Sequence, residues 1–162
     1  MAPKKRIALS GGFDPIHIGH VKMIKAAAQH GDVYVILNSD AWLVRKKGYN
    51  FMDFEQRAFI IENIVGVKKV ISVNDDDGTV CDALEKLRPD MFGNGGDRYN
   101  HNTPEGAICQ KYDIQMIWNL GGEKIESSSS LVENYKEKKK EALSTLDSSD
   151  NTKTKDYEWM KK

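Results

Sequence analysis

Short apolar runs alternate along the chain with longer segments in which apolar residues are spaced three and four apart. The short runs predict buried strands, which fall at residues 6–10, 33–37, 69–73, 91–92 and 114–118. The spaced segments predict helices, which fall at residues 18–30, 53–65, 79–87, 103 onward and 127–140. Five alternations of strand and helix favour an α/β fold with a doubly wound, parallel five-stranded sheet and helices on both faces.

Three of the predicted helices have residues suited to capping at their starts. Asp53, with Gln56 three positions later, has the pattern of a capping box. Thr79 is placed to cap the next helix, and Thr103 is followed by Pro104, which favours the first helical position. These residues set the expected starts of three helices.

The length of 162 residues suits one domain with one core. From residue 138 onward the apolar periodicity is lost, and Lys, Ser, Asp and Thr dominate. We therefore expect a globular domain over residues 1–137 and a charged, disordered tail over residues 138–162.

The charge balance excludes some classes of partner. The 24 basic and 24 acidic side chains cancel, so nothing favours long-range attraction to nucleic acid or to an anionic membrane. The basic N-terminus precedes only three apolar residues, too few for a signal peptide. Cys81 and Cys109 form no CxxC pair, and we expect both to be reduced thiols. These features predict a cytoplasmic protein that binds neither nucleic acid nor a membrane.

Glycine-rich and polar loops follow the predicted strands at residues 11–20, 38–40, 93–97 and 121–130. Ligands in open α/β sheets bind beyond the carboxyl ends of the strands, at a topological switch point. We therefore expect these loops to form one composite site.

The first of these loops carries the strongest chemical signal. Gly11 and Gly12 let the backbone approach an anion closely, and His17 and His20 lie on one face at a helix start. Gly19 between them removes a side chain that would block the approach. Backbone N–H groups, the helix dipole and two imidazoles together suit a phosphoryl group in transfer.

The alternative for the two histidines is that they only cap the helix or pack. Their position after a Gly-Gly turn that follows a strand favours function over this alternative. A zinc site is a weaker interpretation, because His30 and His101 have no ligand spacing to the pair.

The string from Gly12 to His20, GFDPIHIGH, resembles the (G/T)FDxxHxGH signature of the cytidylyltransferase-like nucleotidyltransferase superfamily. The resemblance continues in order over residues 6–137, through NSD, RKKG, EQR, RPD, GGD and SSS strings. It is strongest to adenylyltransferase domains that make ADP-activated heptose, and next strongest to glycerol-3-phosphate cytidylyltransferases. It implies a Rossmann-like fold, a nucleoside triphosphate substrate, a phosphorylated small-molecule acceptor and release of pyrophosphate. Family members often pair, so it also allows a homodimer.

The resemblance implies roles for particular residues. His17, His20 and Lys46 would be catalytic. The residues implied in nucleotide binding are Gly12, Phe13, His17, Gly19, His20, Gly96, Asp97, Ser128, Ser129 and Ser130. The residues implied in binding the acceptor or a phosphate are Asp14, Lys46, Lys47 and Arg57. Mg²⁺ bridging the phosphates is expected for this chemistry, with no side-chain metal ligands assigned.

Each of these assignments has a plainer alternative. The two lysines also suit a solvated basic face, and the serine run suits a flexible linker. Arg57 has acidic neighbours in Glu55 and Glu62, with which an ordinary surface ion pair would form. Asp97 also suits a turn.

Two departures from the family pattern leave the base and the acceptor open. Heptose-type relatives carry Lys directly before GGD, where this chain has Asn94. Cytidylyltransferases carry an Arg and an EGIST-like string before the last helix, where residues 119–126 read NLGGEKIE. AMP transfer is favoured, with CTP and glycerol-3-phosphate as the alternative. A non-catalytic nucleotide-binding module is the rival of another class. Residues 17–20 also spell the HIGH signature of class I aminoacyl-tRNA synthetases, but no KMSKS-like loop accompanies them.

Overall fold

The computed structural model describes residues 2–96, 102–123 and 126–148. The chain divides into two compact units, Met1–Ser128 and Ser129–Lys162. The elements, in chain order, are β1 (Arg6–Gly11), α1 (Ile18–Ala28), β2 (Asp32–Leu37), α2 (Asp40–Lys47), α3 (Phe54–Glu62), β3 (Val67–Ser72), α4 (Cys81–Leu87), β4 (Met91–Gly95), α5 (Pro104–Lys111), β5 (Gln115–Leu120) and α6 (Ser128–Ser148).

The five strands form one parallel sheet, as predicted, and their order in it is β3-β2-β1-β4-β5. The central strand β1 pairs with β2 along its whole length, from Arg6 opposite Asp32 to Gly11 opposite Leu37. The chain builds β2 and β3 on one side of β1 and then returns to β4 on the other side. The topological switch point therefore lies between β1 and β4.

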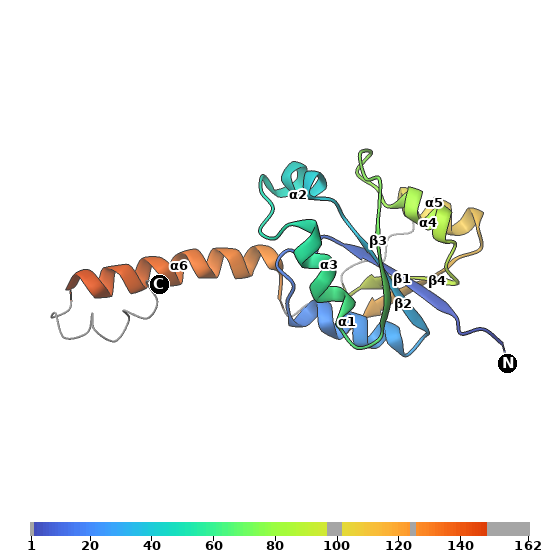
Figure 1. The fold of residues 1–162 in the computed structure, drawn as a ribbon, viewed down its shortest axis with the longest axis horizontal. Helices are drawn as coiled ribbons and strands as arrows, with labels where there is room; N and C mark the ends of the chain where they lie inside the picture. Colours follow the sequence, from blue (N-terminus) through green and yellow to red (C-terminus); the bar gives the residue numbers. More distant parts are fainter. Residues whose placement is uncertain (1, 97–101, 124–125, 149–162) are drawn as a thin grey trace. The chain divides into compact units, whose positions relative to one another are not determined.

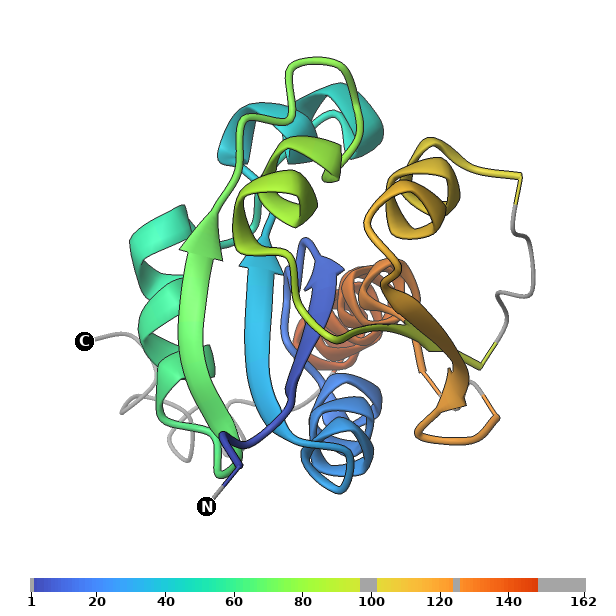
Figure 2. The same cartoon turned by 90° about the vertical axis from the view of Figure 1, so that its right-hand side faces the viewer.

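Helices cover both faces of the sheet (Figures 1 and 2). Residues of β1 alternate between the two faces, because successive side chains of a strand point in opposite directions. Leu9 packs in one core cluster with Ile24 of α1 and Ile61 of α3. Ala8 packs in the other cluster with Leu84 of α4 and Cys109 of α5. The predicted doubly wound architecture is thereby confirmed.

The predicted helix caps are confirmed only in part. The hydroxyl of Thr103 accepts a hydrogen bond from Gly106 N at the start of α5, with Pro104 in the first turn. The capping box predicted at Asp53 is wrong, because its side chain makes no cap bond and instead accepts from Asn50 Nδ2 at 3.0 Å.

The start of α4 also differs from the prediction. Its N-cap residue is Val80 rather than Thr79. The hydroxyl of Thr79 still accepts a 3.3 Å hydrogen bond from Cys81 N, so the threonine satisfies one of the first backbone donors of the helix.

The last helix corrects the predicted tail. α6 runs to Ser148, so the boundary predicted after residue 137 falls inside it, and residues 138–148 are helical rather than disordered. The physical reason is composition: Lys, Glu, Ala and Leu are strong helix formers even where they bury little surface. Residues 149–162 lie outside the described part of the chain.

Two further observations concern the described residues. None of their helices is both long and apolar enough to cross a bilayer. Cys109 is buried, Cys81 is half-buried, and both are free thiols.

Candidate active site

The loop after β1 begins with backbone held close to neighbouring side chains. A Cβ added to Gly12 would lie 2.6 Å from Leu43 Cδ2, so the buried Leu43 side chain would have to shift to admit it. The next residue, Phe13, has a φ of 51°, in the left-handed region that non-glycine residues seldom adopt. Its ring is buried and lies 4.7 Å from the ring of His20. This strained turn at the end of the central strand directs the loop toward the start of α1.

The two predicted histidines meet at the N-terminus of α1. Their rings stack with centroids 3.8 Å apart and planes 26° apart. His17 is the N-cap residue, and its Nδ1 accepts from Gly19 N at 3.0 Å. His20 Nδ1 accepts from His17 N at 3.2 Å, which closes a reciprocal capping box. The structure therefore brings both predicted imidazoles together at a helix N-terminus, where anions bind favourably.

His20 is held as a neutral ring. Burial lowers its pKa most, and the positive charges of His17, when protonated, and of Lys47 lower it further, to about 3. A neutral imidazole always carries one N–H donor, so this ring donates a hydrogen bond without changing charge near pH 7.

The two predicted lysines of α2 have different surroundings. Lys47 Nζ donates to the carbonyl oxygen of Asp14 at 3.1 Å, and its charge acts on His20. Lys46 Nζ lies 4.5 Å from the centre of the Trp42 ring, in a cation–π contact. Lys47 is therefore the lysine that the described contacts place beside the histidine pair.

Asp14, which is predicted to contact the acceptor or a phosphate, is fully buried. Its two carboxylate oxygens accept from Phe51 N and Met52 N, each at 2.6 Å. The side chain fixes the segment between α2 and α3 against the first loop. Backbone donors satisfy the charge that burial would otherwise make costly.

Arg57 is also buried, so the alternative of an ordinary surface ion pair is wrong, whereas its contact with the acceptor or a phosphate stays a prediction. Its guanidinium donates to the carbonyl oxygens of Gly12 (2.8 Å), Asn38 (2.9 Å) and Met52 (2.9 Å). It also pairs with the Asp40 carboxylate at 2.6 Å. Arg57 thus joins three loops, and its carboxylate partner is Asp40 rather than Glu55 or Glu62.

Asp75 is a buried residue at this edge that sequence reasoning missed. Its carboxylate accepts from Ser39 N (2.8 Å), Ser39 Oγ (2.6 Å) and Asn38 Nδ2 (3.1 Å). Burial alone would raise its pKa, but these hydrogen bonds outweigh burial and lower it. The signal available in the sequence was the pairing of NSD after one strand with DDD after the next.

On the other side of β1, glycine allows the loops after β4 and β5 to touch. A Cβ on Gly96 would overlap the carbonyl oxygen of Gly122. Asn94 sits at a register shift between β4 and β5, where its Nδ2 lies 3.4 Å from the carbonyl oxygens of Phe92 and Ile117. The predicted nucleotide residue Asp97 lies outside the described residues.

The predicted serine run begins where the two units divide. Ser128 is buried, and its hydroxyl donates to the carbonyl oxygen of Pro15 at 2.8 Å. Ser128 is therefore bonded to the same loop as the histidines. Ser129 and Ser130 belong to the second unit and lie in the first turn of α6.

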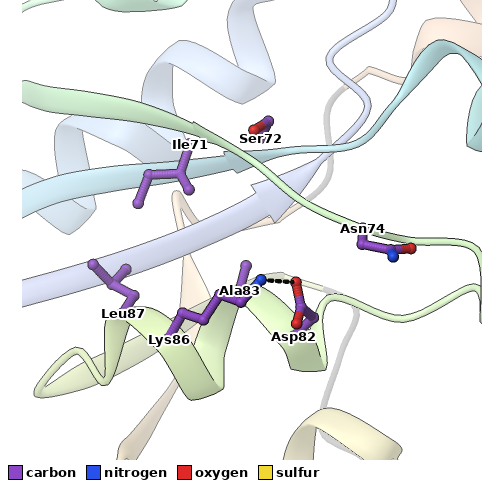
Figure 3. Close-up of a pocket in the computed structure, with 7 residues that line it drawn as sticks. All are labelled: Ile71, Ser72, Asn74, Asp82, Ala83, Lys86 and Leu87. Carbon is purple, nitrogen blue, oxygen red and sulfur yellow. Dashed lines mark hydrogen bonds and ion pairs between the residues drawn. The ribbon is translucent and has the colours of Figure 1, made fainter.

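Within the described ranges, no group of three or more His, Cys, Asp or Glu side chains is arranged to hold a metal ion. A surface pocket of about 300 Å³ lies between the end of β3 and α4, with the Lys86–Asp82 ion pair along one wall (Figure 3). Its lining residues include none of the predicted site residues. The candidate site is therefore defined by the convergence of loops and not by this pocket.

The sheet is doubly wound and parallel, with two capped imidazoles and a lysine at its switch point. This fold and site indicate a Rossmann-like nucleotidyltransferase. The chain belongs to the cytidylyltransferase-like family, whose model matches residues 8–149.

The chain is similar in sequence to relatives named "Bifunctional protein HldE", of which two are described here. The one from Geobacter metallireducens is 37% identical over 108 residues, covering 65% of this chain and 21% of the relative. The one from Nitratiruptor sp. is 35% identical over 133 residues, covering 80% and 27%. The chain therefore spans about a fifth to a quarter of the relatives it matches.

A solved structure shares the fold. The lipopolysaccharide core biosynthesis protein from Thermoplasma volcanium superposes with a TM-score of 0.60 at 21% identity, covering 72% of this chain and 97% of that one. At this identity the likeness shows the fold alone.

Proposed function

We propose that this chain transfers AMP from ATP to the phosphate of a phosphorylated sugar and releases pyrophosphate. The observation that carries the proposal is the stacked imidazole pair at the start of α1, with Lys47 beside it. Neutral donors and a fixed cation at a helix N-terminus stabilise the charge that develops on a phosphoryl group in transfer.

In the proposed reaction, an oxygen of the acceptor phosphate attacks the α-phosphorus of ATP. A new P–O bond forms as the bond to the bridging oxygen between the α- and β-phosphates breaks. Pyrophosphate leaves with that electron pair. The attacking oxygen is already ionised near pH 7, so the step needs no general base. Catalysis then depends on alignment and on charge stabilisation by His17, His20 and Lys47.

Other residues take supporting roles in this proposal. The backbone N–H groups at Gly12 and Phe13 contact the nucleotide, and Gly96 lies beside its base or ribose. Ser128, whose hydroxyl is bonded to the loop of the histidines, holds a phosphate of the triphosphate. Lys46, held over the Trp42 ring on the exposed side of α2, receives the acceptor phosphate. Asp14 and Arg57 act beneath the site as positioning residues.

Mg²⁺ is part of the proposal as a partner of the phosphates. Mg²⁺ sites usually combine one or two carboxylates with phosphate oxygens and water. Both carboxylate oxygens of Asp14, the acidic residue of the first loop, already accept backbone hydrogen bonds. The donor set therefore suits an ion that binds through the triphosphate, where it would neutralise phosphate charge.

The choice of ATP rests on the HldE relatives and on the resemblance to domains that make ADP-activated heptose. The test is pyrophosphate release from each of the four ribonucleoside triphosphates with sugar phosphates, glycerol-3-phosphate or pantetheine phosphate. We expect ATP with a sugar phosphate to give the fastest release. A preference for CTP with glycerol-3-phosphate would establish the alternative substrate pair.

The same assay tests the mechanism. His17→Ala and His20→Ala should each lower kcat by about 10²–10³-fold, the usual effect of losing one preorganised donor. His30→Ala, an exposed histidine just beyond α1, is the matched control and should retain full activity. Equal release by all four proteins would refute the mechanism and favour a non-catalytic nucleotide-binding module.

Substitutions of Lys46 and Lys47 should change different kinetic constants. Lys47→Met should lower kcat, because its cation lies beside the imidazole pair. Lys46→Met should chiefly raise the KM for the acceptor. The reverse pattern would exchange their proposed roles.

A further inference from the structure

The N-terminus of α1 is capped in an unusual chemical way. N-cap positions favour Ser, Thr, Asp or Asn, whose oxygens accept from the first free N–H groups of the helix. Here the acceptors are two imidazole nitrogens: His17 Nδ1 accepts from Gly19 N at 3.0 Å, and His20 Nδ1 accepts from His17 N at 3.2 Å. A nitrogen that accepts a hydrogen bond carries no proton. In a neutral ring the proton must therefore be on Nε2.

We propose that the capping box of α1 fixes both histidines as neutral Nε2–H tautomers, so that the pair donates hydrogen bonds to phosphate and neither gains nor loses a proton during turnover. The identity of the acceptor, a phosphate, rests on the proposed function. The tautomers themselves follow from the capping hydrogen bonds. It separates two roles that a histidine pair at an active site can play, those of general acid–base and of fixed donor.

The surroundings of the pair keep it in this state. His20 lies between the Phe13 ring and the His17 ring. The cation of Lys47 faces it from α2, and the Asp14 carboxylate of the same loop is engaged by Phe51 N and Met52 N. Protonating His20 Nδ1 would add a third positive charge to this cluster if His17 were also protonated, and it would break the bond from His17 N. Burial and these neighbours hold the pKa of His20 at about 3, well below neutral pH.

Gly19 is a positioning residue for the His17 ring of the capping box. A Cβ at this position would lie 2.9 Å from His17 Cε1 and 3.0 Å from His17 Nδ1. The glycine is therefore needed because the ring of His17 folds back over it, in addition to any approach by a ligand. The clash would be with the far end of a side chain, so Gly19→Ala should rotate the imidazole away and leave the helix intact.

The tautomers can be measured without substrate. Long-range ¹H–¹⁵N NMR of the imidazoles in the full chain distinguishes a bare, pyridine-like nitrogen from a protonated, pyrrole-like one. We expect Nδ1 of both His17 and His20 to be pyridine-like and Nε2 to be pyrrole-like at pH 7, with His20 unchanged down to about pH 4. A pyrrole-like Nδ1 in either ring, or an imidazolium at pH 7, would overturn the inference.

Variants then separate capping from donation. His17→Asn keeps an acceptor at the N-cap and should retain the wild-type Tm, whereas His17→Ala should lower Tm by about 2–4 °C. Both should lose about 10²-fold or more in kcat, because neither has the Nε2–H donor. A Tm as low in His17→Asn as in His17→Ala would overturn the capping role.

Gly19→Ala completes the test. We expect its Tm to stay within about 2 °C of wild type, because the helix propensity that alanine adds offsets the cap bond lost when the ring rotates. Its His17 signals should shift while those of His20 persist, and its kcat should fall at least 10-fold with little change in KM. Unchanged His17 signals would refute the positioning role. If the tautomers are as expected but no triphosphate is turned over by wild type, the proposed function fails while the capping inference stands.

Discussion

On the side of β1, β2 and β3, the loops at the carboxyl edge of the sheet are joined by buried charged groups. On the side of β4 and β5, the loops instead meet through backbone that only glycine permits. Arg57 and Asp75 exemplify the first construction, and the contact of Gly96 with Gly122 exemplifies the second. Directed hydrogen bonds fix the positions of individual carbonyl and amide groups, as catalysis of phosphoryl transfer requires. Close backbone packing sets only the distance between two loops.

The largest expected effect comes from removing the central charge of the first side. Arg57→Met should destabilise the fold by about 3–5 kcal/mol, because it leaves the carbonyl oxygens of Gly12, Asn38 and Met52 without their donor. Urea denaturation measures this loss. The control is Arg45→Met, whose side chain is 47% exposed and which should cost less than about 1 kcal/mol. Equal losses in the two variants would show that the buried charge is not what joins the loops.

The second effect tests the glycine contact. Gly96→Ala should cost about 2–3 kcal/mol, since its Cβ would meet the carbonyl oxygen of Gly122, which is backbone and moves only with its loop. Gly95→Ala is the matched control, because the nearest atom to its Cβ is Met23 Sδ at 3.7 Å. We expect the control to stay within about 1 kcal/mol of wild type in the same urea titration. A tolerant Gly96 would remove the contrast between the two sides.

A smaller effect is expected at Asp75. Asp75→Asn keeps the shape of the side chain but replaces a carboxylate that accepts three hydrogen bonds from Ser39 and Asn38. The loss should be about 1–2 kcal/mol at pH 7, below that of Arg57→Met. Asp76→Asn, an exposed neighbour, is the control and should be neutral. A neutral Asp75→Asn would contradict the role of this carboxylate in joining the ends of β2 and β3.

The last effect is absent at neutral pH and appears on acidification. The folded pKa of His20, about 3, is below its ordinary 6.5, so the unfolded chain binds the proton first and stability falls as pH drops from about 6.5 toward 3. The folded pKa of Asp75 is below 3.8, so its contribution is present above that value and is lost at lower pH. Stability measured against pH should therefore fall in two ranges. His20→Gln should remove the upper range, and Asp75→Asn should diminish the lower one. A single range unaffected by either variant would contradict these assignments.

The sequence predicts much of this arrangement, and the exceptions have a common cause. The strands were recognisable because both faces of the sheet are covered, which makes their residues continuously apolar. The histidine pair was recognisable because its members are three positions apart in one helix turn. Arg57 contacts Gly12, 45 positions earlier in the chain, and Asp75 contacts Ser39, 36 positions earlier. Such partners become adjacent only after folding, so the sequence does not reveal that Arg57 and Asp75 join loops.

A prediction from local sequence spacing also fails where another residue nearby takes the expected hydrogen bond. Asp53 has the spacing of a capping box, but its carboxylate accepts from Asn50 instead. Composition predicted disorder from residue 138, whereas α6 continues to Ser148. Asn94 is the position at which the chain departs from the heptose-type pattern. It lies at an irregularity in the pairing of β4 with β5, which the periodicity of the sequence does not reveal.

The double use of the two imidazoles has a consequence for interpreting relatives of this chain. A descendant that had lost transfer chemistry would still need acceptors for the first N–H groups of α1, and amide side chains would supply them as well as rings do. Such a chain would be expected to carry Asn at position 17 and Gln at position 20, with the glycine between them free to change. The combination Asn-x-x-Gln would then indicate a relative that keeps the helix cap but lacks the two Nε2–H donors.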